Sequence, residues 1–256
     1  MILDDFKLDG QVAYVTGASR GLGRAMAEAL AEAGAGVALA ALPSEEEAMK
    51  DVARYITSLG RKCLTIGVDL SGVEAAVASV DTVITNFGRL DILVNNAGMT
   101  RRRVSIEHTV DDWDAVMNLN SRTVFFMAQA AAKHMLARGS GKIINTASML
   151  SFQGGRGVPS YTASKGAVAS ITRALANEWA GKGVNVNAIA PGYMRTDLNT
   201  ALMNDPVRSQ QILGRIPAGR WGEPADLKGA VVFLASRASN YLSGHILCVD
   251  GGWLSS

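Results

Sequence analysis

The chain has 256 residues, of which 48% are hydrophobic and 19% are charged, and 25 Lys and Arg against 23 Asp and Glu give a formal net charge of +2. This composition excludes intrinsic disorder, because the apolar content is high enough to offset the entropy lost on folding. The near balance of charge provides no global field that would favour nucleic acid or anionic lipid as a partner.

The sequence shows neither a membrane-span pattern nor a secretory leader pattern. The longest uncharged stretch, Ile143 to Gly155, is too short and too polar for a transmembrane helix. The segment Met1 to Lys7 carries acids where a signal peptide has basic residues. Cys63 and Cys248 form neither a disulfide framework nor a zinc spacing. We therefore expect a cytoplasmic protein with reduced thiols.

Short apolar runs alternate with longer helical patterns along the chain, which is typical of parallel βαβ units. The expected strands are Val12–Thr16, Val37–Leu42, Cys63–Val68, Ile92–Asn95, Lys142–Thr146, Val184–Ala190 and His245–Val249. The expected helices are Leu22–Ala33, Glu45–Leu59, Val73–Phe87, Val110–Ala137, Ser160–Ala180 and Pro224–Ser236. The pattern predicts an α/β protein with a seven-stranded parallel sheet and helices on both faces.

The region between 192 and 223 is the least regular part of the chain. Glycines, prolines and polar residues there interrupt a short helical stretch at Leu198–Leu213. No repeat, low-complexity tract or linker marks a domain boundary, so we predict a single domain over residues 1–256. A long connection at this depth is either a substrate lid or a packed surface excursion, and we predict a lid at about 192–223.

The first predicted strand leads directly into a glycine-rich turn, Thr16 to Gly23, and then into an Ala-rich helix. This order places free backbone N–H groups and the positive end of a helix dipole against a pyrophosphate. Gly17 permits the turn, Gly21 permits close backbone approach, and Gly23 lets the helix pack on the sheet. The spacing alone is weak evidence, because three nearby glycines are also found in ordinary turns.

Tyr161 and Lys165 are four residues apart, which places both side chains on one helix face. A free phenol titrates at about 10, but a neighbouring ammonium lowers its pKa and makes it a usable general acid and base. Ser148 follows a predicted strand, at the carboxyl edge where α/β sheets bind ligands. An exposed helix pair and a loop serine are the alternatives.

The motifs resemble, in order and position, those of the short-chain dehydrogenase/reductase family. The matching positions span nearly the whole chain: Thr16–Gly23, Asn95–Gly98, Asn120, Ser148, Tyr161, Lys165 and Pro191–Gly192. The resemblance implies a Rossmann fold, a homotetramer and a reaction in which hydride passes between a nicotinamide cofactor and a CH–OH group. A catalytically silent nucleotide-binding regulator on the same fold is the alternative from another functional class.

The resemblance also implies roles for individual residues. Ser148 orients and polarises the substrate carbonyl, Tyr161 transfers the proton, and Lys165 holds the nicotinamide ribose and lowers the tyrosine pKa. Asn120 anchors a proton-relay water, unless it is a buried helix asparagine bonded to backbone. The implied cofactor contacts are Gly17, Ser19, Arg20, Gly21, Leu22, Gly23, Asp69, Leu70, Asn96, Ala97, Gly98, Tyr161, Lys165, Pro191, Gly192, Met194 and Thr196.

The choice between NAD and NADP depends on the residues after the second predicted strand. NAD enzymes usually carry an acid about 20 residues beyond the glycines, but here the chain reads Ala40-Ala41-Leu42-Pro43. Arg20 favours a 2′-phosphate, whereas the run Glu45 to Glu47 repels one. We predict NAD, with NADP not excluded. Asp69 matches the family residue that bonds the adenine amino group, or it is a helix N-terminal acid.

Three stretches, Asp112–Asn120, Ala147–Gly155 and Arg215–Gly222, resemble sugar-acid dehydrogenases within the family more closely than other members. They imply a sugar-acid substrate of the kind formed in pectin degradation. Within the family, gluconate oxidation and reduction of a 3-oxoacyl thioester are the alternatives. The thioester reductases would be expected to prefer NADPH and to expose basic residues for an acidic carrier protein.

The run Arg101 to Arg103 follows the fourth predicted strand, beside the expected nicotinamide site. The planar guanidinium fork suits a carboxylate, although a solvated basic loop is the usual fate of a charge run. We predict that Arg101 or Arg102 binds the substrate carboxylate, with Gln153 and Arg215 as weaker candidates. No metal is predicted, because the histidines lack ligand spacing: His108, His134 and His245.

Overall fold

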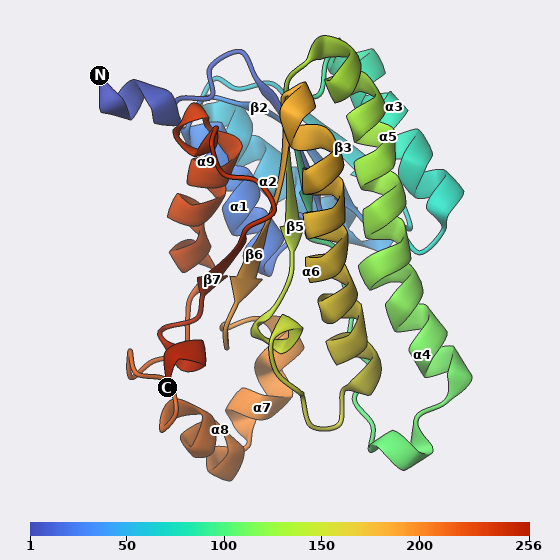
Figure 1. The fold of residues 1–256 in the computed structure, drawn as a ribbon, viewed down its shortest axis with the longest axis vertical. Helices are drawn as coiled ribbons and strands as arrows, with labels where there is room; N and C mark the ends of the chain where they lie inside the picture. Colours follow the sequence, from blue (N-terminus) through green and yellow to red (C-terminus); the bar gives the residue numbers. More distant parts are fainter.

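The computed structural model describes residues 1–256, and its centre is one seven-stranded parallel sheet in the order β3-β2-β1-β4-β5-β6-β7 (Figure 1). The strands are β1 (Val12–Thr16), β2 (Gly36–Ala41), β3 (Cys63–Gly67), β4 (Ile92–Asn95), β5 (Gly141–Thr146), β6 (Val184–Pro191) and β7 (Ile246–Val249). Because every neighbouring pair is parallel, all the strands end at one carboxyl edge. The predicted sheet is confirmed, and each strand boundary differs from its prediction by at most one residue.

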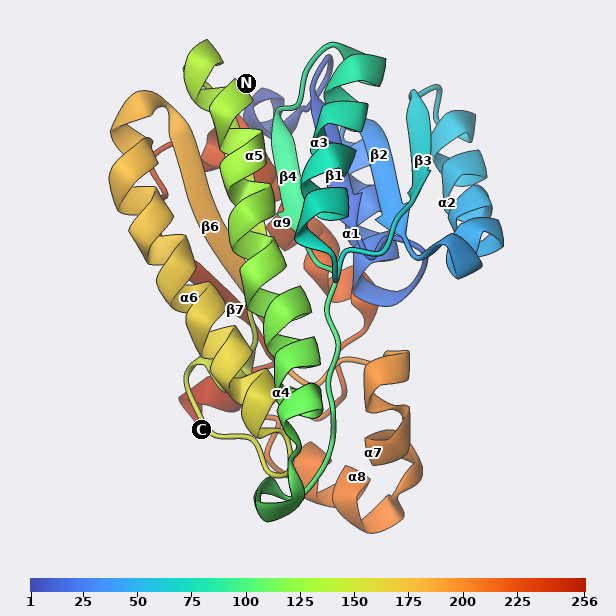
Figure 2. The ribbon, with the colours of Figure 1, turned by 90° about the vertical axis from the view of Figure 1, so that its right-hand side faces the viewer.

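Helices cover both faces of the sheet, as predicted (Figures 1 and 2). They are α1 (Gly21–Glu32), α2 (Glu46–Ser58), α3 (Val73–Phe87), α4 (Val110–Met117), α5 (Thr123–Arg138), α6 (Pro159–Trp179), α7 (Thr200–Asn204), α8 (Pro206–Leu213) and α9 (Lys228–Ala235). One face is covered by α1, α2 and α9, and the other by α3, α5 and α6. None of these helices is both long and apolar enough to span a membrane.

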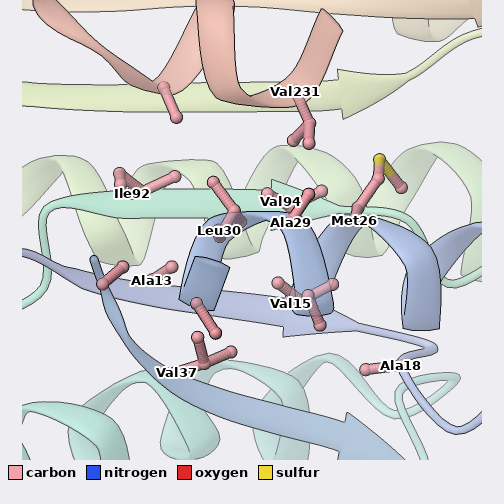
Figure 3. Packing of buried hydrophobic residues seen from close by; sticks show 14 of the residues in the cluster. Ala13, Val15, Ala18, Met26, Ala29, Leu30, Val37, Ile92, Val94 and Val231 are labelled. Carbon is pink, nitrogen blue, oxygen red and sulfur yellow. The ribbon is translucent and has the colours of Figure 1, made fainter. Parts of the chain in front are cut away.

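Both faces of the central strands are fully buried. Along β1, Ala13 and Val15 pack into the cluster under α1 and α9, while Tyr14 packs into the cluster on the opposite face. This alternation follows from the two-residue period of a strand, and burial on both sides explains its nearly continuous apolar sequence. Figure 3 shows Val15 below Ala29 and Leu30 of α1, and Val231 of α9 on the far side of Val94 of β4. Alanines on α1 let the helix approach the sheet closely.

Two helical predictions are corrected by the structure. The helix expected over Val110–Ala137 contains a π-turn at Asn118–Arg122 that separates α4 from α5. The stretch Leu198–Leu213 divides into α7 and α8 because Pro206 has no N–H to continue the first helix. Asp205 then starts α8 by accepting a hydrogen bond from the backbone N–H of Arg208 at 3.0 Å. The sequence contains no periodicity that marks a π-turn.

Residues 192–223, here called the 192–223 segment, carry α7 and α8 beyond the carboxyl edge of the sheet, at the lower end of both views (Figures 1 and 2). The two ends of the segment are joined by a parallel bridge between Met194 and Gly222. The N–H of Gly222 donates to the carbonyl of Tyr193 at 2.9 Å, and the N–H of Arg195 donates to the carbonyl of Gly222 at 2.7 Å. The segment therefore leaves and re-enters the body of the protein at one place.

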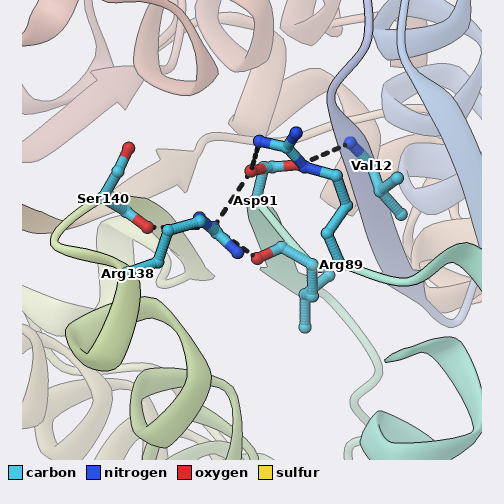
Figure 4. A network of polar contacts seen from close by, with 6 residues as sticks. Val12, Arg89, Asp91, Arg138 and Ser140 are labelled. Carbon is cyan, nitrogen blue, oxygen red and sulfur yellow. Dashed lines mark hydrogen bonds and ion pairs between the residues drawn. The ribbon is translucent and has the colours of Figure 1, made fainter. Parts of the chain in front are cut away.

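At the opposite edge of the sheet, the buried carboxylate of Asp91 collects three cationic or N–H donors (Figure 4). Arg89 binds both of its oxygens at 2.8 Å, and Arg138 of α5 lies 3.0 Å away. The backbone N–H of Val12 donates to the same carboxylate at 2.9 Å. Since the Asp91 side chain is only 8% exposed, this network connects β1, β4 and α5 around one desolvated charge.

We predict that Asp91→Asn lowers the free energy of unfolding by about 2 kcal/mol, because it leaves two guanidinium groups without their anion. The loss is smaller than for a fully buried pair because both arginines are partly exposed. Urea unfolding measures it. Asp51→Asn is the matched control, since its partner Arg54 is exposed, and its effect should stay below about 0.5 kcal/mol. Equal effects of the two substitutions would show that the network adds no stability.

Candidate functional site

The glycine-rich turn after β1 has the shape that the sequence predicts. Gly17 adopts a φ of +62°, in the left-handed region that favours glycine. Gly23, in the first turn of α1, packs so closely on the preceding turn that a Cβ there would collide with the carbonyl oxygen of Gly17. The N-terminus of α1 is thereby brought close to the backbone of the turn, with its free N–H groups at the carboxyl edge.

This turn is held against the loop after β4 by hydrogen bonds from two polar side chains. The hydroxyl oxygen of Thr16 accepts the backbone N–H groups of Asn96 at 2.9 Å and Ala97 at 3.0 Å. The side-chain amide of Asn96 donates in return to the carbonyls of Thr16 at 2.9 Å and Gly17 at 3.2 Å. Because both turns are tied in two directions, neither can shift independently of the other.

A cavity of about 810 Å³, here called the glycine cavity, opens at these turns. It is lined by most of the residues predicted to contact a cofactor: Gly17, Ser19, Arg20, Gly21, Leu22, Gly23, Asp69, Leu70, Asn96, Ala97, Gly98, Tyr161, Lys165 and Thr196. Its remaining lining was not predicted and comes largely from Ala41, Leu42, Val68, Ser71, Met99, Ala115, Asn118 and Leu119. The volume and the glycine-rich turn fit a dinucleotide.

A second cavity of about 400 Å³, here called the arginine cavity, lies next to the first and is covered by the 192–223 segment. Three predicted cofactor contacts line this cavity instead: Pro191, Gly192 and Met194. Its charged lining consists of four arginines with no Asp or Glu: Arg102, Arg156, Arg208 and Arg215. Arg156 and Arg208 were not predicted. The predicted substrate residues Ser148 and Gln153 also line it.

The run Arg101 to Arg103 does not act as one cluster. Arg101 lines the glycine cavity, whereas Arg102 lines the arginine cavity. The guanidinium of Arg103 pairs with the carboxylate of Asp112 at 3.1 Å, so its charge is already compensated. Of the two residues predicted to bind the substrate carboxylate, only Arg102 therefore lines the arginine cavity, and its role stays a prediction. Consecutive residues in an extended loop point in different directions, which sequence proximity alone conceals.

The two cavities meet at Tyr161, which lines both. Ser148 lines only the arginine cavity, while Lys165 lines only the glycine cavity. The position of Tyr161 and Lys165 on α6 follows from their four-residue spacing, and Ser148 sits just beyond β5. The two cavities also share Leu22, Thr146, Thr196 and Leu198, and the phenol of Tyr161 is the one titratable group in both linings, so ligands in either cavity can approach it.

The titration of Tyr161 and Lys165 is governed by burial. Burial raises the pKa of the Tyr161 phenol, and a hydrogen bond with the Ser148 hydroxyl opposes that shift. Burial lowers the pKa of the Lys165 ammonium to about 8. The Lys165 Nζ donates to the carbonyl of Thr146 at 2.6 Å and lies 5.6 Å from the centre of the phenol ring. The lowering of the tyrosine pKa by Lys165, expected from the spacing, is not seen here.

Asn120 lies in the π-turn and is fully buried. Its side-chain oxygen accepts the N–H of Met99 at 2.9 Å, and its amide donates to the carbonyl of Met99 at 2.8 Å and to the hydroxyl of Ser164 at 3.1 Å. These bonds join the loop after β4 to α6. The alternative of a buried asparagine bonded to backbone therefore describes its side chain, and its part in a proton relay stays a prediction.

The end of the glycine cavity near β2 carries a set of paired charges. The Ser19 hydroxyl donates to the Glu45 carboxylate at 2.6 Å, and Arg20 pairs with the same carboxylate at 2.8 Å. Arg20 also pairs with Asp197 of the 192–223 segment at 3.0 Å. Two carboxylates thus neutralise the one arginine at this end. Asp69, also in the lining, accepts the backbone N–H of Ser71 at 2.9 Å.

Comparison with known proteins agrees with this arrangement. A family model described as enoyl-(acyl carrier protein) reductase matches residues 17–254. The 2-dehydro-3-deoxy-D-gluconate 5-dehydrogenase of Escherichia coli (strain K12) is 54% identical over 100% of both chains. The gluconate 5-dehydrogenase of Gluconobacter oxydans (strain 621H) is 41% identical over 97% of this chain and 96% of its own length.

A solved structure is also closely similar. The gluconate 5-dehydrogenase from Burkholderia cenocepacia J2315, in complex with NADP and tartrate, matches with a TM-score of 0.95 at 42% identity and covers 100% of both chains. The similarity extends over the whole sheet and its helices, and includes the 192–223 segment. The backbone arrangement described above is therefore shared with proteins of known chemistry.

We predict that Lys165→Met stabilises the ligand-free protein at pH 7 by up to about 3 kcal/mol. The folded-state pKa of about 8 lies below the ordinary value of 10.5, so the cost of burying the ammonium is fully present below pH 8. Between these values the folded lysine is neutral while the unfolded one is charged, so wild-type stability rises with pH. The difference between variant and wild type should therefore shrink from pH 7 to pH 10.

Urea unfolding at pH 7 and pH 9.5 measures this difference. Lys133→Met, which removes an exposed lysine of α5, is the control for a pH-independent effect of losing a positive charge. A Lys165→Met difference that stays constant across this pH range would contradict the assignment of a desolvated ammonium.

Proposed function

The chain belongs to the short-chain dehydrogenase/reductase family and is an oxidoreductase that acts on CH–OH groups, and we propose that its substrate is a sugar acid, as a 2-dehydro-3-deoxy-D-gluconate 5-dehydrogenase. The observation that carries this proposal is the arginine cavity, which holds four arginines and no carboxylate and meets the glycine cavity at Tyr161. Arginine without an acidic partner suits a carboxylate ligand.

The glycine cavity fits a nicotinamide dinucleotide, because the close packing at Gly17 and Gly23 brings the N-terminus of α1 to the cavity, where its free N–H groups suit a pyrophosphate. The bound nicotinamide supplies the hydride acceptor or donor. The chain's own residues position the substrate and manage one proton. Ser148 binds the reacting oxygen, and Tyr161 takes the hydroxyl proton during oxidation or returns it during reduction.

Lys165 serves this chemistry from the cofactor side. Its Nζ is held by the carbonyl of Thr146, and its buried position places a cation beside the phenol without an opposing carboxylate. We assign it to the ribose of the bound nucleotide and to stabilising the phenolate of Tyr161 once the site is filled. The buried phenol has a raised pKa in the ligand-free protein, so that stabilisation is what makes it a usable base at neutral pH.

For the cofactor, we propose NAD. A 2′-phosphate would meet the Glu45 carboxylate, which Ser19 holds in place, and the guanidinium of Arg20 is already paired with Glu45 and Asp197. Glu45 thus supplies the acid that is missing at the end of β2. The Burkholderia relative was solved with NADP, so selection between the two cofactors is expected to depend on these few side chains.

Gluconate 5-dehydrogenase is the second candidate, since gluconate carries the same carboxylate and the arginine cavity suits it equally. The higher identity to the 2-dehydro-3-deoxy-D-gluconate enzyme favours the first candidate. A 3-oxoacyl thioester reductase is less well supported, because a thioester has no carboxylate for four unpaired arginines to bind. A silent regulator would not need Ser148 on one side of Tyr161 and Lys165 on the other.

Three further expectations belong to this proposal. The 192–223 segment acts as the substrate lid, since it supplies residues to both cavities. The protein works in the cytoplasm, where nicotinamide dinucleotides are available. It assembles as a homotetramer, whose neighbouring copies would cover the exposed apolar side chains of Val104, Ile106, Val110 and Trp113.

We expect Tyr161→Phe to lower kcat by at least about a thousandfold with 2-dehydro-3-deoxy-D-gluconate and NAD, because the proton acceptor is removed. NADH formation measures turnover, and NADH fluorescence should show that the variant still binds cofactor. Tyr241→Phe, at an exposed tyrosine, is the matched control. Turnover of Tyr161→Phe within tenfold of wild type would refute the mechanism.

The same assay decides the substrate when it is run with gluconate, a neutral hexitol and, in the reverse direction, a 3-oxoacyl thioester. Activity with the two acids and little with the hexitol is the expected pattern. If only the thioester reacted, the sugar-acid assignment would be wrong.

We expect Glu45→Gln to shift the NAD-to-NADP ratio of kcat/KM by at least about tenfold toward NADP, because it removes a like charge and releases Arg20. Glu46→Gln is the control, since Glu46 is the first residue of α2 and follows Glu45 directly but does not line the glycine cavity. An unchanged ratio in Glu45→Gln would show that another group selects the cofactor.

A further inference from the structure

One face of the short helix α8 is turned toward the arginine cavity. Arg208, Gln211 and Ile212 of α8 line it at a spacing of three and four residues, which is that of a single helix face, and Arg215 lines it just beyond the end of the helix. A helix face that only packs against a core is apolar, but here Ile212 is the one buried residue among two guanidinium groups and an amide. The composition of this face indicates a polar ligand beneath it.

Arg208 differs from the other three arginines of the cavity. Arg102, Arg156 and Arg215 are exposed, whereas Arg208 is half-buried. Its guanidinium pairs with no carboxylate and donates only to the side-chain oxygen of Gln211, at 3.1 Å. A guanidinium that lines a cavity and has no anionic partner in the protein suits a ligand that brings the anion.

Arg215 is fixed in another way. Its guanidinium lies 4.1 Å from the ring centre of Trp253, and this ring in turn contacts Tyr193 edge-on at 4.8 Å. This contact with Trp253 holds Arg215 just beyond the end of α8. It therefore contributes positive charge to the cavity, while Arg208 is the least exposed arginine of the lining and has no carboxylate partner.

We propose that Arg208 binds the carboxylate of the sugar acid and, with Gln211 beside it, selects acids over neutral polyols. The inference rests on the proposed function and assigns its main carboxylate contact to α8 rather than to Arg101 or Arg102. The guanidinium fork donates to both carboxylate oxygens, and Gln211 keeps the fork in place. Arg208 is thus a specificity-determining residue carried by the 192–223 segment, remote in sequence from Ser148, Tyr161 and Lys165.

The test compares 2-dehydro-3-deoxy-D-gluconate with its C1 amide, which has the same shape without the charge. In wild type, kcat/KM should favour the acid, and Arg208→Gln should reduce this acid-to-amide preference by roughly 30-fold, the value of a charged hydrogen-bond pair. Arg208→Lys keeps the charge but loses the fork, so an intermediate loss is expected. Arg195→Gln, in the same segment but outside the cavity, should keep the wild-type preference.

Thermal unfolding and NADH binding of each variant establish that the fold and the glycine cavity are intact. An acid-to-amide preference in Arg208→Gln within threefold of wild type would overturn the inference, as would a loss seen in Arg215→Gln and not in Arg208→Gln. If wild type failed to oxidise the acid at all, the proposed function would fail instead, so the two failures are distinguishable.

Discussion

The reciprocal hydrogen bonds between Thr16 and Asn96 are the interaction on which both cavities depend. At the carboxyl edge of a parallel sheet the strands stop, and their last backbone groups lose their ladder partners where water is largely excluded. Thr16 and Asn96 satisfy these groups for the turns after β1 and β4. A continuing chain of buried side chains runs from Asn95 to Asn145 at 3.0 Å and on to Thr172 of α6 at 3.0 Å.

These bonds explain how the partly buried Tyr161 and the buried Lys165 keep their places without a carboxylate beside them. Asn145 and Thr172 fix α6 against the sheet, and Asn120 fixes it against the loop after β4. The helix then presents Tyr161 and Lys165 to two different cavities. Desolvation of Lys165 makes the ligand-free site locally unfavourable. Burying Lys165 therefore lowers the stability of the folded protein at a position where the reaction needs a cation, as is common at functional sites.

Much of this arrangement can be predicted from sequence, because it rests on local patterns. Strand and helix periodicity, the glycine turn and the four-residue spacing of Tyr161 and Lys165 depend on neighbouring residues, and the structure contains them as expected. The division of Arg101 and Arg102 between two cavities does not follow from their adjacency. The π-turn at Asn118–Arg122 and the satisfied amide of Asn120 depend on contacts with Met99 and Ser164, which are remote in the chain.

The residues of α8 that line the arginine cavity could be predicted only in part. The spacing of Arg208 and Gln211 after Pro206 is visible in the sequence, but the irregular composition of the region hides the short helix that places both side chains on one face.

The bridge between Met194 and Gly222 closes the 192–223 segment into a ring by joining its two ends. The ring also contacts the body of the protein, since Asp197 pairs with Arg20 at 3.0 Å and the N–H of Ala218 donates to the carbonyl of Gly251 at 2.9 Å. Residues of the ring outside such contacts can be replaced without moving β6, because the ends stay paired. The fold thereby places the reacting residues Tyr161 and Lys165 on α6 and a substrate-recognition residue, Arg208, on the 192–223 segment. Grafting a different ring between positions 195 and 221 is a route by which one dehydrogenase scaffold acquires a new substrate while retaining its redox chemistry.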